Sequence, residues 1–367
     1  GNTFAGTEAG ISNSDSYFNT ATGFNALYMN VGGSSNTANG YQALYNNIGD
    51  QNTATGYRAL YSNTFGIYNT AAGFEALFSN TEGAYNTALG ADALHANTTG
   101  IYNTANGYQA LAGNSTGSYN TATGYLSLGA TTAGYNTAYG ASALAANITG
   151  DHNTSVGYNS TANNTTGSNN TAFGAGALIS ATGSNNTGLG ASADVAAGAS
   201  NSTAAGSGAY VAASNQVKMG NNSVTSIGGS TGWSNFSDGR FKTNIKENVP
   251  GLDFINQLKP VTYNYDIHKL NEHIQPGTTN TNNKNDVIKP RETTNTKTEK
   301  LKEDAIIAKE KKIYTGFIAQ DVEKIADKMG YDFSGVYKPQ NDKDAYGISY
   351  ADFVVPLVKA VQQLSNM

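Results

Sequence analysis

The sequence contains no cysteine among its 367 residues, so disulfides and cysteine-based zinc or iron–sulfur sites are excluded. Charged residues make up only 13% of the chain, and the formal net charge of −5 at pH 7 lacks the basic excess typical of nucleic-acid binding. No apolar run reaches the roughly 18 residues of a membrane-spanning helix. The first residues also lack the basic and apolar regions of a signal peptide. We therefore expect no nucleic-acid partner and no membrane span.

Proline is absent from residues 1–236, whereas all six prolines lie in residues 237–367. The first region holds 36 of the 43 glycines, two basic residues and eight acidic ones, and the second holds 19 basic and 18 acidic residues. This change in composition predicts a domain boundary near residue 236. Regular leucine, tyrosine and phenylalanine distinguish the first region from a flexible glycine-rich linker.

The first region is built from one short repeat. An Asn-Thr pair recurs every 16 or 17 residues, a glycine follows its asparagine by four residues, and an aromatic residue and an Ala-Leu pair usually come next. The asparagines of these pairs are Asn19, Asn36, Asn52, Asn69, Asn86, Asn103, Asn120, Asn136, Asn153 and Asn170. A fixed internal period of this kind indicates a solenoid.

The residue types predict a mainly β fold, a parallel β-roll or β-solenoid of about 12 turns over residues 1–200. A helical repeat needs more than about 30 residues, whereas about 17 suit two short strands and two tight turns. Glycine supplies positive φ at the turns, and missing proline leaves every backbone N–H available to a strand ladder. Stacked turns place asparagine over asparagine and tyrosine over tyrosine, which allows amide bonding and ring stacking along the axis.

A single copy of this solenoid has few apolar side chains to bury. Each turn offers one leucine and a few alanines, and burying a leucine contributes roughly 2–3 kcal/mol. Ordering 17 residues of backbone costs on the order of 17–30 kcal/mol. Ladder hydrogen bonds close part of this gap, and burial against other copies of the chain is expected to supply the rest. We therefore expect an obligate oligomer, and a homotrimer suits a fibre.

The repeats over residues 1–215 resemble the head of trimeric autotransporter adhesins, whose parallel β-rolls assemble in threes. Their Asn-Thr-Ala-x-Gly and Ala-Leu elements are also similar to those of bacterial surface and phage fibre proteins. The repeat then decays, and residues 201–236 are expected to form a neck with short strands at 215–220 and 223–229. Trp233 is expected to be a packing anchor at the boundary.

The second region predicts a small α+β domain over residues 237–367. We expect helices at 252–258 and 319–329, the latter ending at Gly330, with strands at 260–265, 314–318, 335–337 and 348–350. The last helix spaces its apolar residues as in a coiled-coil seam: Tyr350, Val354, Leu357, Val361 and Leu364. Residues 267–312 form a polar insert, interpreted as a flexible loop or as a protruding arm.

Three stretches of this region resemble the endosialidase-type intramolecular chaperone: Ser-Asp-x-Arg-x-Lys at 237–242, Gly-Phe-Ile-Ala-Gln-Asp-Val at 316–322 and the helix after Tyr350. That family lies at the C-terminus of trimeric phage tail spikes and fibres and of related bacterial surface proteins. The resemblance implies trimerisation, templating of the preceding β-rich fibre and, in many members, self-cleavage. It implies a Ser–Lys dyad, Ser237 and Lys242, that cuts the Phe236–Ser237 bond.

The chemistry of such a dyad is consistent with the residue types. A serine hydroxyl needs a base to take its proton, and lysine is a base only when neutral, a form that burial favours. Ser237 would attack the carbonyl of Phe236, and water would resolve the ester once per chain. The alternative is an ordinary Ser-Asp-Gly turn beside a solvated Lys242. Asp238 and Arg240 are expected to be structural partners.

Other candidate sites are weak, and no cofactor or metal is expected. His95, His152, His268 and His273 share no metal-ligand spacing, and we expect surface positions for them and no histidine ladder. The eight acidic residues of the shaft are scattered through the repeat and form no glycosidase pair.

The sequence thus predicts a structural homotrimeric fibre outside the cell, on a cell surface or on a virion or injection particle. Its expected role is attachment to an unknown cell-surface or glycan receptor. Enzymatic activity is limited to a single autoproteolytic cut. The alternatives are a non-cleaving fibre that retains the C-terminal domain as tip or anchor and, less favoured, a glycan-degrading spike.

Overall fold

The computed structural model describes residues 1–230, 234–275 and 296–367, apart from the side chains of 296–299. The described chain forms two compact units, residues 1–221 and 222–367, and each has its own core. Trp233, the expected packing anchor, lies outside the described residues. The helices within the described ranges are all too short or too polar to cross a membrane.

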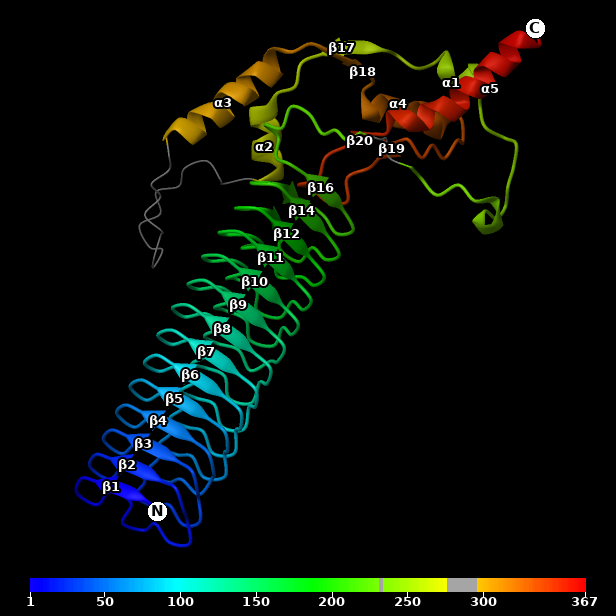
Figure 1. Cartoon of the computed structure of the whole chain (residues 1–367). Helices are drawn as coiled ribbons and strands as arrows, with labels where there is room; N and C mark the ends of the chain where they lie inside the picture. Colours follow the sequence, from blue (N-terminus) through cyan, green and yellow to red (C-terminus); the bar gives the residue numbers. More distant parts are fainter. Residues whose placement is uncertain (231–233, 276–295) are drawn as a thin grey trace. The chain divides into compact units, whose positions relative to one another are not determined.

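The first unit is a parallel β-solenoid (Figure 1). Most turns span 16 or 17 residues and contribute one strand of three residues, which pairs in register with the next turn, as Thr70 does with Thr87. Within residues 1–221, all of them described, fourteen strands form this sheet: β1 (Thr3–Ala5), β2 (Thr20–Thr22), β3 (Thr37–Asn39), β4 (Thr53–Thr55), β5 (Thr70–Ala72), β6 (Thr87–Leu89), β7 (Thr104–Asn106), β8 (Thr121–Thr123), β9 (Thr137–Tyr139), β10 (Thr154–Val156), β11 (Thr171–Phe173), β12 (Thr187–Leu189), β14 (Thr203–Ala205) and β16 (Val217–Met219). The predicted β-solenoid is confirmed. Strands β14 and β16 lie within the stretch that the sequence assigns to a neck.

The second strand expected in every turn forms at only one place in this unit. There β13 (Asp194–Val195) pairs in parallel with β15 (Tyr210–Val211). In the earlier turns of the solenoid, the chain around the Ala-Leu segment forms consecutive tight backbone turns in place of a strand. In one of them φ is 51° at Glu75 and 53° at Leu77. Sequence reasoning assigned positive φ to glycine alone. Leucine avoids this region in isolation, so contacts with the stacked turns must hold it there.

The glycines that follow each Asn-Thr asparagine by four residues form a column, here called the column glycines. These positions need glycine because φ is positive and because the next turn lies too close for a side chain. Gly73 has a φ of +147°, and a Cβ there would lie 2.3 Å from the carbonyl oxygen of Gly90 in the next turn. The same close approach recurs along the column: Gly6, Gly23, Gly40, Gly56, Gly90, Gly107, Gly124, Gly140, Gly157 and Gly174. Without side chains at these positions the turns can stack at strand spacing.

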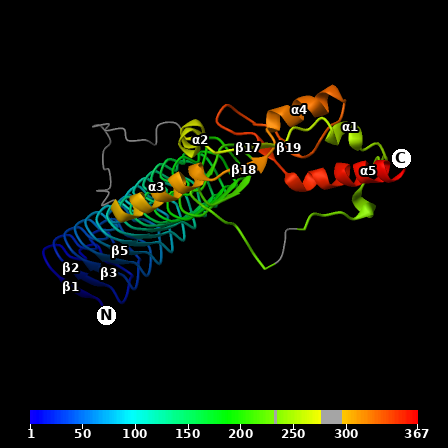
Figure 2. The same ribbon diagram turned by 90° about the horizontal axis from the view of Figure 1, so that it is seen from above.

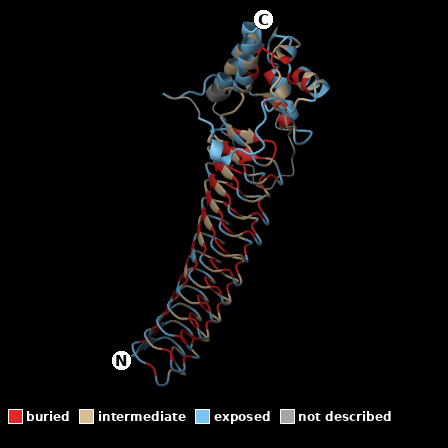
Figure 3. Ribbon diagram, turned by 90° about the vertical axis from the view of Figure 1, so that its right-hand side faces the viewer, coloured by how far each residue is buried: buried red, intermediate tan, exposed pale blue. Residues whose placement is uncertain are grey.

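Alanine and leucine fill the narrow interior of the solenoid. In one turn Ala54, Ala59 and Leu60 are all fully buried, and equivalent residues line most of the other turns. In Figure 3 buried residues, in red, recur in successive turns of the solenoid. Thr161 and Asp194 occupy the leucine position in their own turns and are also buried.

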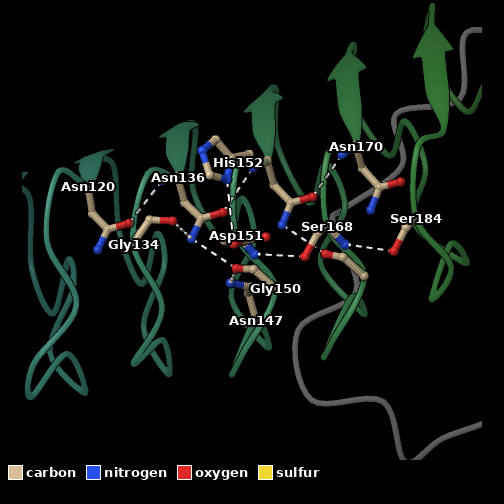
Figure 4. Close-up of polar contacts among 12 residues, drawn as sticks. Asn120, Gly134, Asn136, Asn147, Gly150, Asp151, His152, Ser168, Asn170 and Ser184 are labelled. Atoms are coloured by element: carbon tan, nitrogen blue, oxygen red, sulfur yellow. Dashed lines mark hydrogen bonds and ion pairs between the residues drawn. The ribbon is translucent and has the colours of Figure 1, made fainter.

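The asparagine of each Asn-Thr pair is buried and bonds to the backbone of neighbouring turns. Asn136 Oδ1 accepts from the backbone N–H of Asn153 at 3.0 Å, and its Nδ2 donates to the carbonyl oxygen of Gly150 at 3.0 Å (Figure 4). We expected amide-to-amide bonds in this column. The backbone bonds prevail because the tight turns leave buried polar groups that need partners.

A second asparagine column, which sequence reasoning did not single out, makes the amide-to-amide bonds. Asn80 Nδ2 donates to Asn63 Oδ1 at 2.7 Å and to the carbonyl oxygen of Gly83 at 2.9 Å. The members of this column are Asn13, Asn30, Asn47, Asn63, Asn80, Asn97, Asn114, Asn147 and Asn164. Thr131 interrupts it, and Asn114 Oδ1 is buried without a partner there.

Aromatic side chains also stack from turn to turn. Tyr28 begins one column, which continues through Tyr45, Tyr61 and Phe78 at ring separations of 5.0–5.3 Å and ends at half-buried His95. A second column runs from Tyr68 to Tyr135 and ends at exposed His152. The histidines form no ladder with each other, but each one ends an aromatic column, which sequence reasoning did not foresee.

The second unit is a small α+β domain. Its core contains Phe254, Val322, Ala326, Phe333 and Phe353. The elements described in it are η1 (Gly239–Phe241), α1 (Leu252–Ile255), β17 (Val261–Tyr263), α2 (Ile267–Ile274), α3 (Thr296–Lys311), β18 (Tyr314–Gly316), α4 (Ala319–Lys328), β19 (Val336–Tyr337), β20 (Gly347–Ile348), η2 (Tyr350–Phe353) and α5 (Val354–Ser365). Strands β17 and β18 pair antiparallel, as do β19 and β20.

Hydrogen bonds define the end of helix α4 and join helix α1 to helix α5. Helix α4 is followed, as expected, by Gly330 with a φ of +63°, and the N–H groups of Gly330 and Tyr331 donate to the carbonyls of Asp327 and Ala326. Helix α1 lies beside α5 in Figures 1 and 2, where the backbone N–H of Leu252 donates to Gln363 Oε1 at 2.7 Å. The helical segments expected at 319–329 and after Tyr350 are confirmed.

Candidate functional site

The segment expected to carry the dyad folds as a single 3-10 turn, η1. Asp238 begins it, because its carboxylate accepts from the backbone N–H of Arg240 at 2.9 Å. Arg240 Nη2 also lies 2.6 Å from Asp238 Oδ2. This contact lowers the pKa of the Asp238 carboxyl and raises the pKa of Arg240. Asp238 and Arg240 are thus partners of each other, and the turn they fix leaves Ser237 and Lys242 at its two ends.

Ser237 and Lys242 are in direct contact. Lys242 Nζ donates to Ser237 Oγ at 2.8 Å. Phe236, on the other side of the bond expected to be cut, has a fully exposed side chain. The turn between residues 238 and 241 brings the two dyad residues together although they are five positions apart. The contact has the geometry required between a nucleophile and its base.

The surroundings of this pair are open in the single chain. Both Ser237 and Lys242 are exposed. A lysine acts as a base after it loses its proton, and burial is the environment that favours this loss. The single chain therefore supplies the Ser–Lys contact, and a neighbouring surface would have to supply the burial.

Helix α5 carries an exposed apolar face. Its predicted seam residues are exposed by 45–62%: Tyr350 in η2, then Val354, Leu357, Val361 and Leu364. Pro356 and Ala360 face the domain and are buried. A heptad seam exposed to this extent is typical of a helix that lacks its coiled-coil partners.

The described parts of the polar insert are helical, so a loop is the wrong interpretation for them. Asp266 caps α2 by accepting from the backbone N–H of Lys269 at 2.8 Å. Glu310 of α3 accepts from the backbone N–H of Ile267 at 2.8 Å and contacts His268 Nδ1 at 2.8 Å. Glu310 and then Glu303 raise the pKa of His268. These contacts join α2 to α3, whereas residues 276–295 of the insert lie outside the described chain.

The shaft carries a second exposed apolar surface, here called the apolar stripe. Turns two to twelve each place one large apolar side chain directly after or before the column glycine: Phe24, Tyr41, Tyr57, Phe74, Leu89, Tyr108, Tyr125, Tyr139, Tyr158, Phe173 and Leu189. Where this side chain precedes the glycine, as at Leu89, the position after the glycine is alanine, as at Ala91. Ten of these side chains are exposed by 38–51%, and Tyr158 is half-buried. One large apolar side chain therefore adjoins the column glycine in each of these turns, and sequence reasoning did not single out its change from one side of the glycine to the other.

Comparison with known protein families identifies a match in the second unit. Residues 237–287 match the family model described as chaperone of endosialidase. The match begins at Ser237 and includes Lys242, and it bears out the resemblance identified in this part of the sequence. No curated protein matches the chain.

Proposed function

We propose that the chaperone-of-endosialidase segment at residues 237–287 serves the solenoid before it, and that three chains assemble into one fibre. A long β-solenoid followed by this segment is a fibre-type arrangement with a C-terminal intramolecular chaperone. The fibre acts outside the cell, on a cell surface or a virion or injection particle, and attaches to a surface or glycan receptor.

The apolar stripe is the observation that carries this proposal. A large aromatic side chain offers roughly 150–250 Å² of surface, so the ten stripe side chains exposed by 38–51% together present on the order of 800 Å². Soluble monomers rarely expose a contiguous apolar patch of more than a few hundred Å². A stripe side chain adjoins the column glycine in each of these successive turns, so identical chains side by side would bury the stripe along its length. The exposed face of α5 adds a coiled-coil seam for the same chains.

The oligomeric mass of the full chain tests the assembly. Analytical ultracentrifugation of the Ser237→Ala chain, which should stay uncut, should give three times the chain mass at micromolar concentration. Val361→Asp places a charge in the α5 seam and should reduce assembly, whereas Gln362→Asp, one residue along and outside the seam, should leave it unchanged. A monomeric Ser237→Ala chain would refute the proposal.

We also propose one autoproteolytic cut between Phe236 and Ser237, because Lys242 Nζ already contacts Ser237 Oγ. Assembly would bury this exposed pair and favour a neutral Lys242. Ser237 Oγ would then add to the Phe236 carbonyl as Lys242 takes its proton, the peptide nitrogen would leave with a proton, and water would hydrolyse the ester. The cut would therefore report correct assembly.

Mass spectrometry of the purified protein tests the cut. The wild-type chain should break before Ser237, whereas Ser237→Ala and Lys242→Ala should stay intact. Lys246→Ala changes a nearby exposed lysine and should cut normally. An intact wild-type chain within a folded trimer would favour the alternative function, in which residues 237–367 remain as a permanent tip or anchor.

A further inference from the structure

Glu75, Asp92 and His95 come together on the surface of the solenoid. One oxygen of each carboxylate and one imidazole nitrogen all lie within 4.8 Å of one another, and all three residues are half-buried. The repeat explains their meeting. Glu75 and Asp92 hold the same position in adjacent turns, six residues after their Asn-Thr asparagines, so the stacking sets one carboxylate above the other. The sequence spacing of the three is 17 and 3, which resembles no familiar metal motif.

The two carboxylates lack a fixed cationic partner. Neither Glu75 nor Asp92 forms an ion pair with lysine or arginine anywhere in the described chain. Arg58 holds the equivalent position one turn earlier, but its Nε donates to Gln42 Oε1 at 2.9 Å instead. Gln109 Nε2 contacts Asp92 Oδ2 at 3.4 Å, a neutral contact. Two negative charges one turn apart repel each other, and a bound cation would remove this repulsion.

The imidazole is already positioned beside the first carboxylate. His95 Nε2 lies 3.4 Å from Glu75 Oε2. Two ligands of a tetrahedral ion with bonds of about 2.1 Å are themselves about 3.4 Å apart, so this pair matches one edge of the tetrahedron. The ring of His95 lies against Phe78 at 5.2 Å and 9°, which fixes its orientation. An Asp92 carboxylate oxygen lies within 4.8 Å of the ligand atoms of both Glu75 and His95, so it is placed to serve as the third ligand.

We propose that Glu75, Asp92 and His95 bind one divalent first-row transition ion per chain, with Zn²⁺ as the best fit. An imidazole nitrogen with two carboxylate oxygens suits Zn²⁺ and its neighbours, whereas Ca²⁺ and Mg²⁺ require oxygen ligands alone. Water completes the coordination. Since the three ligands come from two turns, the ion links these turns and stabilises the shaft at that level.

The test uses the full chain, produced without a polyhistidine tag. Calorimetry with Zn²⁺ and visible spectroscopy with Co²⁺ should give one saturable site per chain, and Ca²⁺ should not compete. Asp92→Asn should weaken Zn²⁺ binding at least tenfold. His95→Tyr should do the same while keeping the fold, because tyrosine already holds this column position at Tyr28, Tyr45 and Tyr61.

The control is His152→Tyr. His152 also ends an aromatic column and has a carboxylate nearby, with Nδ1 3.5 Å from Asp151 Oδ2, but it belongs to no group of three ligands in the described chain. This variant should bind Zn²⁺ as the wild type does. The melting temperature should rise with Zn²⁺ in the wild type and in His152→Tyr but not in His95→Tyr. Absence of stoichiometric binding to the wild type, or unchanged binding to a folded His95→Tyr variant, would overturn the proposal.

Discussion

The interruption of the second asparagine column at Thr131 can be repaired by one substitution. Elsewhere in the column each Nδ2 donates to the Oδ1 of the preceding turn, but Thr131 has no amide and leaves the buried Asn114 Oδ1 without a partner. Thr131→Asn would supply the missing donor. Asn47 is the template, because it lies in a turn of the same 16-residue length and bonds to Asn30 Oδ1 at 3.1 Å and to the carbonyl of Gly49 at 2.7 Å.

The expected gain is about 1–2 kcal/mol. A satisfied hydrogen bond contributes about 1 kcal/mol net, and a buried unsatisfied acceptor costs about 1–3 kcal/mol. Against this, Thr131 Oγ1 now accepts from Asn147 Nδ2 at 3.3 Å and from the backbone N–H of Ala133 at 3.2 Å. The Oδ1 atom of the introduced asparagine would replace the first of these contacts, and the second would be lost.

Guanidinium unfolding of the solenoid, followed by circular dichroism, measures this gain. The reverse change, Asn47→Thr, is the matched control, since it creates the same gap in a complete part of the column and should destabilise the shaft by about 1–3 kcal/mol. If Thr131→Asn is no more stable than the wild type while Asn47→Thr is clearly weaker, the energetic account of the column is wrong.

Two further predictions concern single positions of the shaft. Gly73→Ala combines positive φ with a backbone clash and should destabilise the solenoid by about 3 kcal/mol or more in the same unfolding assay, whereas Gly32→Ala, which has positive φ but open space, should cost less. Burial raises the pKa of the Asp194 carboxyl from 3.8 to about 6, so the fold favours its protonated form. The protonated carboxyl contributes its full stability below about pH 4, and this stability is lost as the pH rises through 6. Asp194→Asn should therefore gain about 3 kcal/mol relative to the wild type between pH 4 and pH 7.5, and a constant difference over this range would contradict the assignment.

The sequence predicted the period, the class of solenoid and the role of the column glycines, because these follow from spacing and residue type. The left-handed backbone of Leu77 could not be predicted, because local preference opposes it and only the stacked turns impose it. The backbone bonds of the Asn-Thr column depend in the same way on which carbonyls the turns leave open. A residue-by-residue alignment of the turns would have shown that His95 follows the tyrosines and Phe78 in an aromatic column.

The candidate site was only partly predictable. Ser237 and Lys242 were identified through a family resemblance, and their contact depends on the turn that Asp238 and Arg240 hold between them. The seam of α5 followed from its heptad spacing. The helices α2 and α3 were missed because their joining contacts, from Glu310 to Ile267 and His268, connect residues more than 40 positions apart.

Because equivalent residues stack from turn to turn, the number of turns sets the length of the shaft. Each turn contacts chiefly the turns before and after it, so removing or duplicating 17 residues in register would preserve every column and change the shaft by about 4.8 Å. Turns of 16 and 17 residues already coexist in one sheet, so small insertions at the outer loops leave the register intact. The reach of the fibre can therefore be adjusted in uniform steps by copying a short coding unit, without redesign of the core, the stripe or the C-terminal domain.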